Sequence, residues 1–174
     1  AVKMFEEPQR YMALLNWARR VLSSSDTEES IAILKKTFLD PSFPVRIRES
    51  IGHDSDIRFS PQERQALFDI LKDDQNPEDL RCGALTQLHQ SNLTSADVRA
   101  CALALAAQDS STELRGYAIQ TLIELPFADV LSGLQELIRQ PYLQAPEFSE
   151  DFELLLDGLI MNGQAQGQHD EIIK

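Results

Sequence analysis

The amino-acid sequence predicts an all-α protein, a right-handed α-α superhelix (solenoid) of about four stacked antiparallel helix pairs. Three observations support this fold class. Apolar residues recur at the three- and four-residue spacing of helix faces along most of the 174-residue chain. Gly is scarce, with 7 residues, and most of the 8 prolines lie between apolar runs. Sequences typical of β-hairpin turns are nearly absent, and Asn162-Gly163 lies in a polar tail.

The most regular feature is an acidic turn followed by a helix that carries an early arginine. Arg48, Arg81 and Arg115 mark three copies of this pattern at nearly equal intervals along the chain. Each interval is long enough for one pair of helices, and such a pair cannot bury its apolar stripes alone. Stacking of neighbouring pairs buries them in a continuous core, which predicts a solenoid.

The first two helices are expected at 8–22 and 27–39. A proline suits the first turn of the first helix, and an apolar stripe follows it. Trp17 is expected to anchor the core at one end of the domain. A serine-rich break follows, and Ser25 or Asp26 is expected to cap the second helix.

A short helix is expected from Pro44 to Gly52, since glycine suits the C-terminal cap of a helix. Ser60-Pro61-Gln62-Glu63 has the pattern of a capping box, with a serine, a proline and a glutamate three residues after the serine. Asn76-Pro77-Glu78-Asp79 repeats this type of start. Two further helices are therefore expected, one ending near Asp73 and one carrying His89 late in its length.

The second half of the chain has the same organisation. Further helices are expected from Thr94 onward, at 109–125, at 127–139 and at 148–161. We expect one repeat domain over 1–161. The segment 162–174, in which Gly, Gln and charged residues dominate, is expected to be frayed or disordered.

The charge balance narrows the classes of partner. The formal net charge is −12 and the isoelectric point is near 4.6. An acidic surface repels phosphate backbones, so nucleic-acid binding is disfavoured, and a basic partner or simple solubility explains the charge better. No stretch approaches the roughly 18 apolar residues that span a bilayer, and no signal peptide is visible. The compartment stays open between cytoplasm and periplasm, and the start at Ala1 is compatible with a piece of a larger or membrane-anchored chain.

The cysteines and histidines of the sequence do not form a pattern typical of a metal site. Cys82 and Cys101 belong to no Cys-x-x-Cys pattern, so a zinc site is not expected. A disulfide between them is conceivable in an oxidising compartment, but two buried thiols are favoured. His53-Asp54-Ser55-Asp56 could be imagined as a metal site, but a solvated loop is favoured because its ligands crowd one short stretch.

The repeated pattern resembles the second helix of a HEAT repeat. It is present as Asp74…Leu80-Arg81-Cys82-Gly83-Ala84…Leu88 and as Asp109…Leu114-Arg115-Gly116-Tyr117-Ala118…Leu122, and more loosely at 40–52. The resemblance implies a ladder of aspartates and arginines between adjacent repeats. Its members here would be Asp40, Asp74 and Asp109 with Arg48 (Arg46 competes for its place), Arg81 and Arg115. The Trp…Leu-Gly…Tyr pattern of tetratricopeptide repeats is not found, and the acidity disfavours the DNA-glycosylase branch of HEAT-like proteins.

The resemblance implies a non-catalytic protein–protein interaction or scaffold module that binds a basic or extended peptide on an acidic concave surface. No catalytic residue, cofactor or metal ligand is predicted, and the oligomeric state stays open. The exposed positions of the second helices would include Glu49, Gln87, Gln120 and Glu124.

Two alternatives remain. The first is a structural piece of a larger solenoid or anchored protein, which would show an exposed apolar end near Met4, Phe5, Met12 or Trp17. The second is a HEAT-like lyase or another enzyme. Its candidate residues would be His53, Asp54, Asp56 and His89, which have no recognised spacing.

Overall fold

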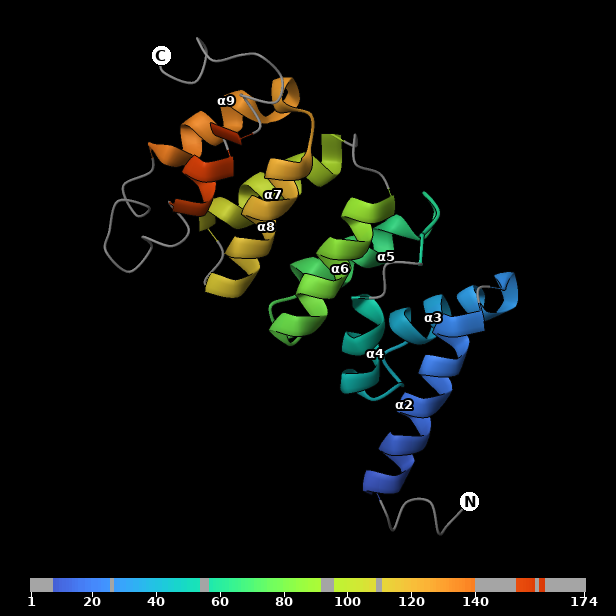
Figure 1. Cartoon of the computed structure of the whole chain (residues 1–174). Coiled ribbons are helices and arrows are strands. Elements are labelled where there is room, and N and C mark those ends of the chain that lie inside the picture. Colours follow the sequence, from blue (N-terminus) through green and yellow to red (C-terminus); the bar gives the residue numbers. More distant parts are fainter. Residues whose placement is uncertain are drawn as a thin grey trace. The chain divides into compact units, whose positions relative to one another are not determined.

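The computed structural model describes residues 8–25, 27–53, 57–91, 96–108, 111–139, 153–158 and 160–161. Within these ranges every regular element is an α-helix and there is no strand, which confirms the all-α prediction (Figure 1). The helices are α2 (Pro8–Ser25), α3 (Glu28–Leu39), α4 (Val45–Gly52), α5 (Arg64–Lys72), α6 (Glu78–Ser91), α7 (Ala96–Gln108), α8 (Thr112–Glu124) and α9 (Phe127–Ile138). Residues 153–158 and 160–161 are helical as well.

The chain forms two compact units, Ala1–Ser91 and Asn92–Lys174. Unit 1 contains α2 to α6, and unit 2 contains α7 to α9 and the helical residues near 153–161. The expected repeat domain over 1–161 covers unit 1 and most of unit 2, and it stays a prediction. The expected polar tail, 162–174, lies outside the described residues.

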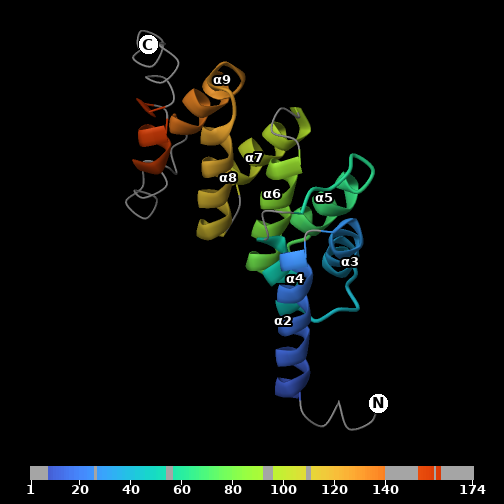
Figure 2. The same ribbon diagram turned by 45° about the vertical axis from the view of Figure 1, so that its right-hand side comes forward.

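In unit 1, α2, α3 and α4 pack against one another, and α6 packs against both α4 and α5 (Figure 2). Because α6 has neighbours on several sides, every residue from Leu80 to Leu85 is buried. The largest fully buried side chains of this unit are Phe38, Ile51, Ile57, Leu67, Leu71, Leu80, Leu85 and Leu88.

Helix α2 corrects two expectations. It continues through the serines that were expected to break it and ends at Ser25. Trp17 does not anchor the core, because 63% of its surface is exposed. The sides of α2 differ: Leu15 and Leu22 are half-buried, while Leu14, Trp17 and Val21 are exposed.

The turn between α3 and α4 recurs between α5 and α6, at the interval that separates Arg48 from Arg81. The backbone N–H groups of Asp40 and Asp73 each bond the carbonyl four residues back, at 3.0 and 3.2 Å. The carbonyls of Pro44 and Pro77 each accept the first bonds of the helix that follows. Asp73 therefore occupies the position in the second turn that Asp40 occupies in the first. The sequence pattern had aligned Asp40 with the next residue, Asp74.

Helices α4 and α6 approach backbone to backbone at Gly52 and Gly83. A Cβ atom added to Gly83 would lie 2.9 Å from the Cα of Gly52, and one added to Gly52 would lie 2.8 Å from the Cα of Gly83. The Nε2 of Gln87 donates to the carbonyl of Gly52 at 2.8 Å beside this crossing. Gly52 is the last residue of α4, where it was expected to serve as a cap, but the close approach is what requires glycine there.

Side chains cap α3 and α8, and a reciprocal side-chain pair lies in the turn before α5. Thr27 caps α3, because its Oγ1 accepts from the N–H of Ser30 at 3.2 Å; Ser25 and Asp26 had been expected there. The two hydrogen bonds expected for a capping box form before α5: the N–H of Ser60 donates to Glu63 Oε2 at 2.7 Å, and the N–H of Glu63 donates to Ser60 Oγ at 3.4 Å. They lie in the turn 61–63, and the helix itself begins at Arg64. Ser111 caps α8.

In unit 2, α7, α8 and α9 pack against one another. Gly133 of α9 lies against the side chain of Leu103 in α7. Gly158 lies against Ile123, which seats the helical residues 153–158 on α8. The fully or nearly fully buried side chains here include Val98, Leu114, Ala118, Ile119, Leu122, Val130, Leu134 and Leu155.

Candidate interaction surface

One side of α8 carries exposed polar and aromatic side chains along most of the helix. Glu113, Tyr117, Gln120 and Glu124 are all exposed, at a spacing of four, three and four residues. This spacing places them on one face, opposite the buried Leu114, Ala118 and Leu122. We call these four residues the α8 stripe.

The stripe contains two of the four residues expected on the partner surface, Gln120 and Glu124. The other two, Glu113 and Tyr117, were not identified from the sequence. They could have been found, because they continue the spacing of Gln120 and Glu124 along the face that carries no aliphatic residues. The apolar side of the same helix has the more regular pattern, and it alone was used to define the helix.

The remaining two expected residues lie in unit 1. Glu49 is half-buried on α4. Gln87 was expected to be exposed, but this expectation is wrong, because the relative exposure of the residue is 0%. The reason is the crossing of α4 and α6, since Gln87 lies one turn after Gly83 and its amide bonds the carbonyl of Gly52. Gln87 therefore belongs to the packing of unit 1 and cannot contact a partner.

The predicted ladder arginines are buried and bond backbone carbonyls. Arg48 Nε donates to the carbonyl of Phe38 at 2.8 Å, and Arg81 Nε donates to the carbonyl of Leu71 at 2.9 Å. Each acceptor lies in the last turn of the preceding helix, where carbonyls lack an intrahelical donor. The two guanidinium groups thus join the two helices of each pair.

Asp40, which was expected to pair with Arg48, is held mainly by its own turn. Hydrogen bonds from the hydroxyl and the backbone N–H of Ser42, the latter at 2.9 Å, lower the pKa of Asp40, and the charges of Lys36 and Arg48 add to this. Burial lowers the pKa of Arg48, while the charge of Asp40 acts in the opposite direction. Asp40 and Arg48 therefore attract each other, but their hydrogen bonds join other groups.

The other expected ladder residues have local contacts. Gln75 Nε2 donates to the carboxylate of the exposed Asp74 at 3.2 Å. Arg115 is buried, and its Nη2 donates to Thr112 Oγ1 at 3.1 Å. Asp109 lies outside the described residues. A ladder between successive repeats stays a prediction.

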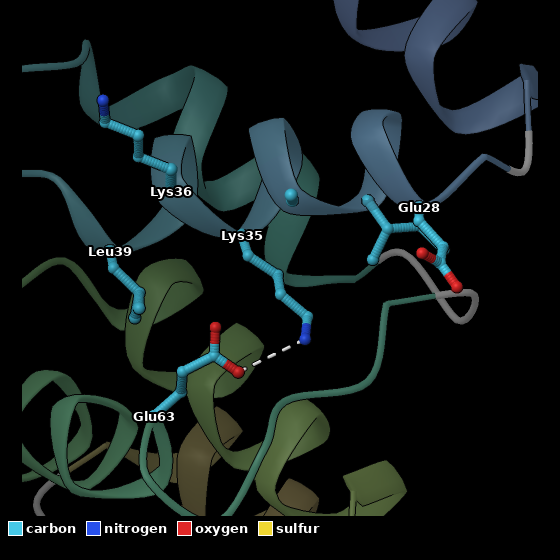
Figure 3. Close-up of a pocket in the computed structure, with 7 residues that line it drawn as sticks. Glu28, Lys35, Lys36, Leu39 and Glu63 are labelled. Atoms are coloured by element: carbon cyan, nitrogen blue, oxygen red, sulfur yellow. Dashed lines mark hydrogen bonds and ion pairs between the residues drawn. The ribbon is translucent and has the colours of Figure 1, made fainter.

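An open pocket of about 360 Å³ lies between α3 and the start of α5 (Figure 3). Lys35 and Glu63 face each other across it, with Nζ and Oε2 3.2 Å apart, and the same ammonium lies 5.4 Å from the centre of the Phe59 ring. Burial acts to raise the pKa of Glu63, but hydrogen bonds from Ser60 and the neighbouring Lys35 hold it below its ordinary value of 4.5. The pair therefore links α3 to the capping box of α5.

Two of the four residues considered for an enzyme lie in the described part of the chain. His53 is exposed after α4 and His89 is half-buried in α6, while Asp54 and Asp56 lie outside the described residues. Among the described residues, no three His, Cys, Asp or Glu side chains are grouped so that they could hold a metal ion. No disulfide joins Cys82 and Cys101; the first is fully buried and the second half-buried.

None of the described helices has the length and apolarity that a membrane crossing requires. Comparisons of the chain with protein-family models, with curated proteins and with solved structures each gave no match.

Proposed function

We propose that this chain is a non-catalytic interaction module that binds a basic segment of a partner protein on the α8 stripe. The observation that carries the proposal is the alignment of two carboxylates, an amide and a tyrosine on one exposed helix face. From Glu113 to Glu124 the stripe extends about 16 Å, at 1.5 Å per residue. An extended segment with several basic residues matches that length.

The chemistry of the stripe suits lysine or arginine side chains. Glu113 and Glu124 provide acceptors for charge-assisted hydrogen bonds at its two ends. Tyr117 offers a ring face for a cation, a contact that contributes about 0.5–1 kcal/mol at an exposed site. The net charge of −12 adds long-range attraction for a basic partner.

The scaffold in this proposal is a right-handed solenoid of HEAT-like helix pairs. Support comes from the turn that recurs in unit 1 and from the two buried arginines, each of which bonds a carbonyl at the same offset in the preceding helix. Equivalent backbone and side-chain bonds at one fixed offset are what stacked repeats of a single supersecondary unit would have.

The proposal is tested with a fluorescently labelled peptide of alternating lysine and alanine, with binding followed by fluorescence anisotropy. Gln120→Lys places a positive charge in the middle of the stripe and should weaken binding about three- to tenfold, since one like charge near a peptide cation costs about 1 kcal/mol. Ser132→Lys is the matched control. It introduces the same residue and the same change in charge at an exposed position of α9, and it should leave affinity nearly unchanged.

Two outcomes would contradict the proposal. Equal loss of affinity in both variants would mean that the peptide responds only to the overall charge of the protein. Full retention of affinity in a Tyr117→Ala, Gln120→Lys double variant would remove the stripe as the binding surface.

A further inference from the structure

Exposed apolar side chains are grouped on two helical segments, one in each unit. On α2, Leu14, Trp17 and Val21 lie at a spacing of three and four residues, and Trp17 is 63% exposed. On the helical residues 153–158 and 160–161, Leu154, Ile160 and Met161 are exposed, and Met161 is 68% exposed. We call these the α2 face and the C-terminal face. Apolar groups gathered on one helix mark a contact surface more strongly than scattered ones.

The two faces carry opposite charges. Helix α2 contains three arginines and no acidic residue, although the whole chain has a net charge of −12. Arg20 is exposed between Trp17 and Val21. Residues 153–161 contain Glu153 and Asp157 and no basic residue, and both carboxylates are exposed beside the apolar side chains. Each face thus combines three apolar side chains with a charge that the other face can neutralise.

We propose that copies of this chain associate head to tail, with the α2 face of one molecule packed on the C-terminal face of the next. The charges favour contact between two different faces over contact between two copies of the same face. Contact between two α2 faces would bring Arg20 against Arg20, and contact between two C-terminal faces would bring Asp157 against Asp157.

The association is heterologous, since different patches of the two molecules meet. Such contacts propagate into open chains of molecules unless the rotation between successive copies closes a ring. Single helix faces bury less than the roughly 1,200 Å² of stable interfaces, so the assembly should be reversible and depend on concentration. None of the residues of this surface belongs to the α8 stripe, so failure of either proposal leaves the other standing.

The test uses two blocking variants of the full chain in sedimentation velocity. Trp17→Glu blocks the α2 face and Met161→Glu blocks the C-terminal face. The unaltered protein should form species that grow with concentration, and each variant alone should stay monomeric. A mixture of the two variants should form a dimer and nothing larger, because one open face remains on each molecule. Val45→Glu, at another exposed apolar residue, is the control and should associate like the unaltered protein.

A charge exchange provides an independent measurement. Arg20→Asp alone and Asp157→Arg alone should each weaken association at least about tenfold, and the double variant should recover it. Circular dichroism melts show whether each variant is folded. The proposal is overturned if the unaltered protein is monomeric at every concentration, if the mixture of blocking variants stays monomeric, or if Met161→Glu alone still dimerises. The last result would indicate pairing of two α2 faces.

Discussion

At the scale of single residues, the packing of unit 1 depends on two glycine positions where there is no room for a side chain. Gly52 and Gly83 bring the backbones of α4 and α6 into contact, and the ring of Phe38 lies against the same point. The sequence identified Gly52 as a helix terminus but could not indicate the contact, because Gly83 belongs to another helix farther along the chain. A close approach between distant glycines depends on tertiary packing, which periodicity along one helix does not describe.

Gly83→Ala should destabilise the protein by about 1–3 kcal/mol, because the added methyl group would meet the backbone of Gly52 and force α4 and α6 apart. Gly116→Ala is the matched control in α8. A Cβ there has no neighbour within 4 Å, and alanine should stabilise the helix by about 0.5–1 kcal/mol. Urea unfolding measures both. Equal effects of the two substitutions would show that the crossing does not limit the stability of unit 1.

Other residues show where sequence reasoning succeeds and where it ends. Burial of Arg48, Arg81 and Arg115 agrees with a structural role for these positions, and the acceptors described for them include two carbonyls and a hydroxyl. Every residue has a backbone carbonyl, so a sequence pattern cannot show which carbonyl an arginine will bond. Trp17 was misplaced because its size suggested burial, although its angular position on α2 lies away from Leu15 and Leu22.

At the scale of helices, most starts and ends were predicted within a few residues. Local rules decide them: Pro44 and Pro77 precede helices, and the Ser60–Glu63 capping box forms as expected. The exceptions are the serines at the end of α2, which continue the helix although serine is common in turns. Packing of α2 on α3 and α4 outweighs their weak local preference.

The capping box of α5 predicts a pH dependence. The pKa of Glu63 in the folded protein lies below its ordinary value of 4.5, so its carboxylate stabilises the fold above that pH. This contribution is lost as the pH falls through the lowered value. Glu63→Gln should therefore lower the melting temperature at pH 7, and the difference from the unaltered protein should shrink towards about pH 3.

Thermal melts at the two pH values measure this effect. Gln62→Ala is the control, because neither residue titrates and position 62 is exposed; any change that it causes should be the same at both values. A difference for Glu63→Gln that does not vary with pH would mean that the charge of Glu63 adds nothing to stability.

At the scale of the whole molecule, the amino-acid composition predicted the fold class and the net charge. The burial of individual polar residues depends on the packing between helices. The all-α class follows from the apolar spacing and the scarcity of glycine. Two of the four residues of the α8 stripe were predicted, since the residues of one helix face can be derived from their spacing alone. Gln87 could not be placed correctly, since α6 is enclosed by α4 and α5 and its polar residues are not all on the surface.

The net charge predicts that added salt stabilises the protein. A chain with a charge of −12 repels itself when compact, and salt screens this repulsion over about 10 Å at 0.1 M. Sodium chloride and potassium chloride should raise the melting temperature equally as ionic strength increases. A rise with sodium sulfate alone would instead indicate exclusion of that salt from the protein surface.

The crossing of α4 and α6 has a consequence for how unit 1 can deform. The missing side chains at Gly52 and Gly83 set how closely the two backbones approach there, but they do not by themselves fix the crossing angle. Gln87, one turn beyond Gly83, supplies a second point of attachment through the carbonyl of Gly52. The glycines therefore determine how near the two helices come, and the hydrogen bond of Gln87 adds to the packing that holds their crossing angle.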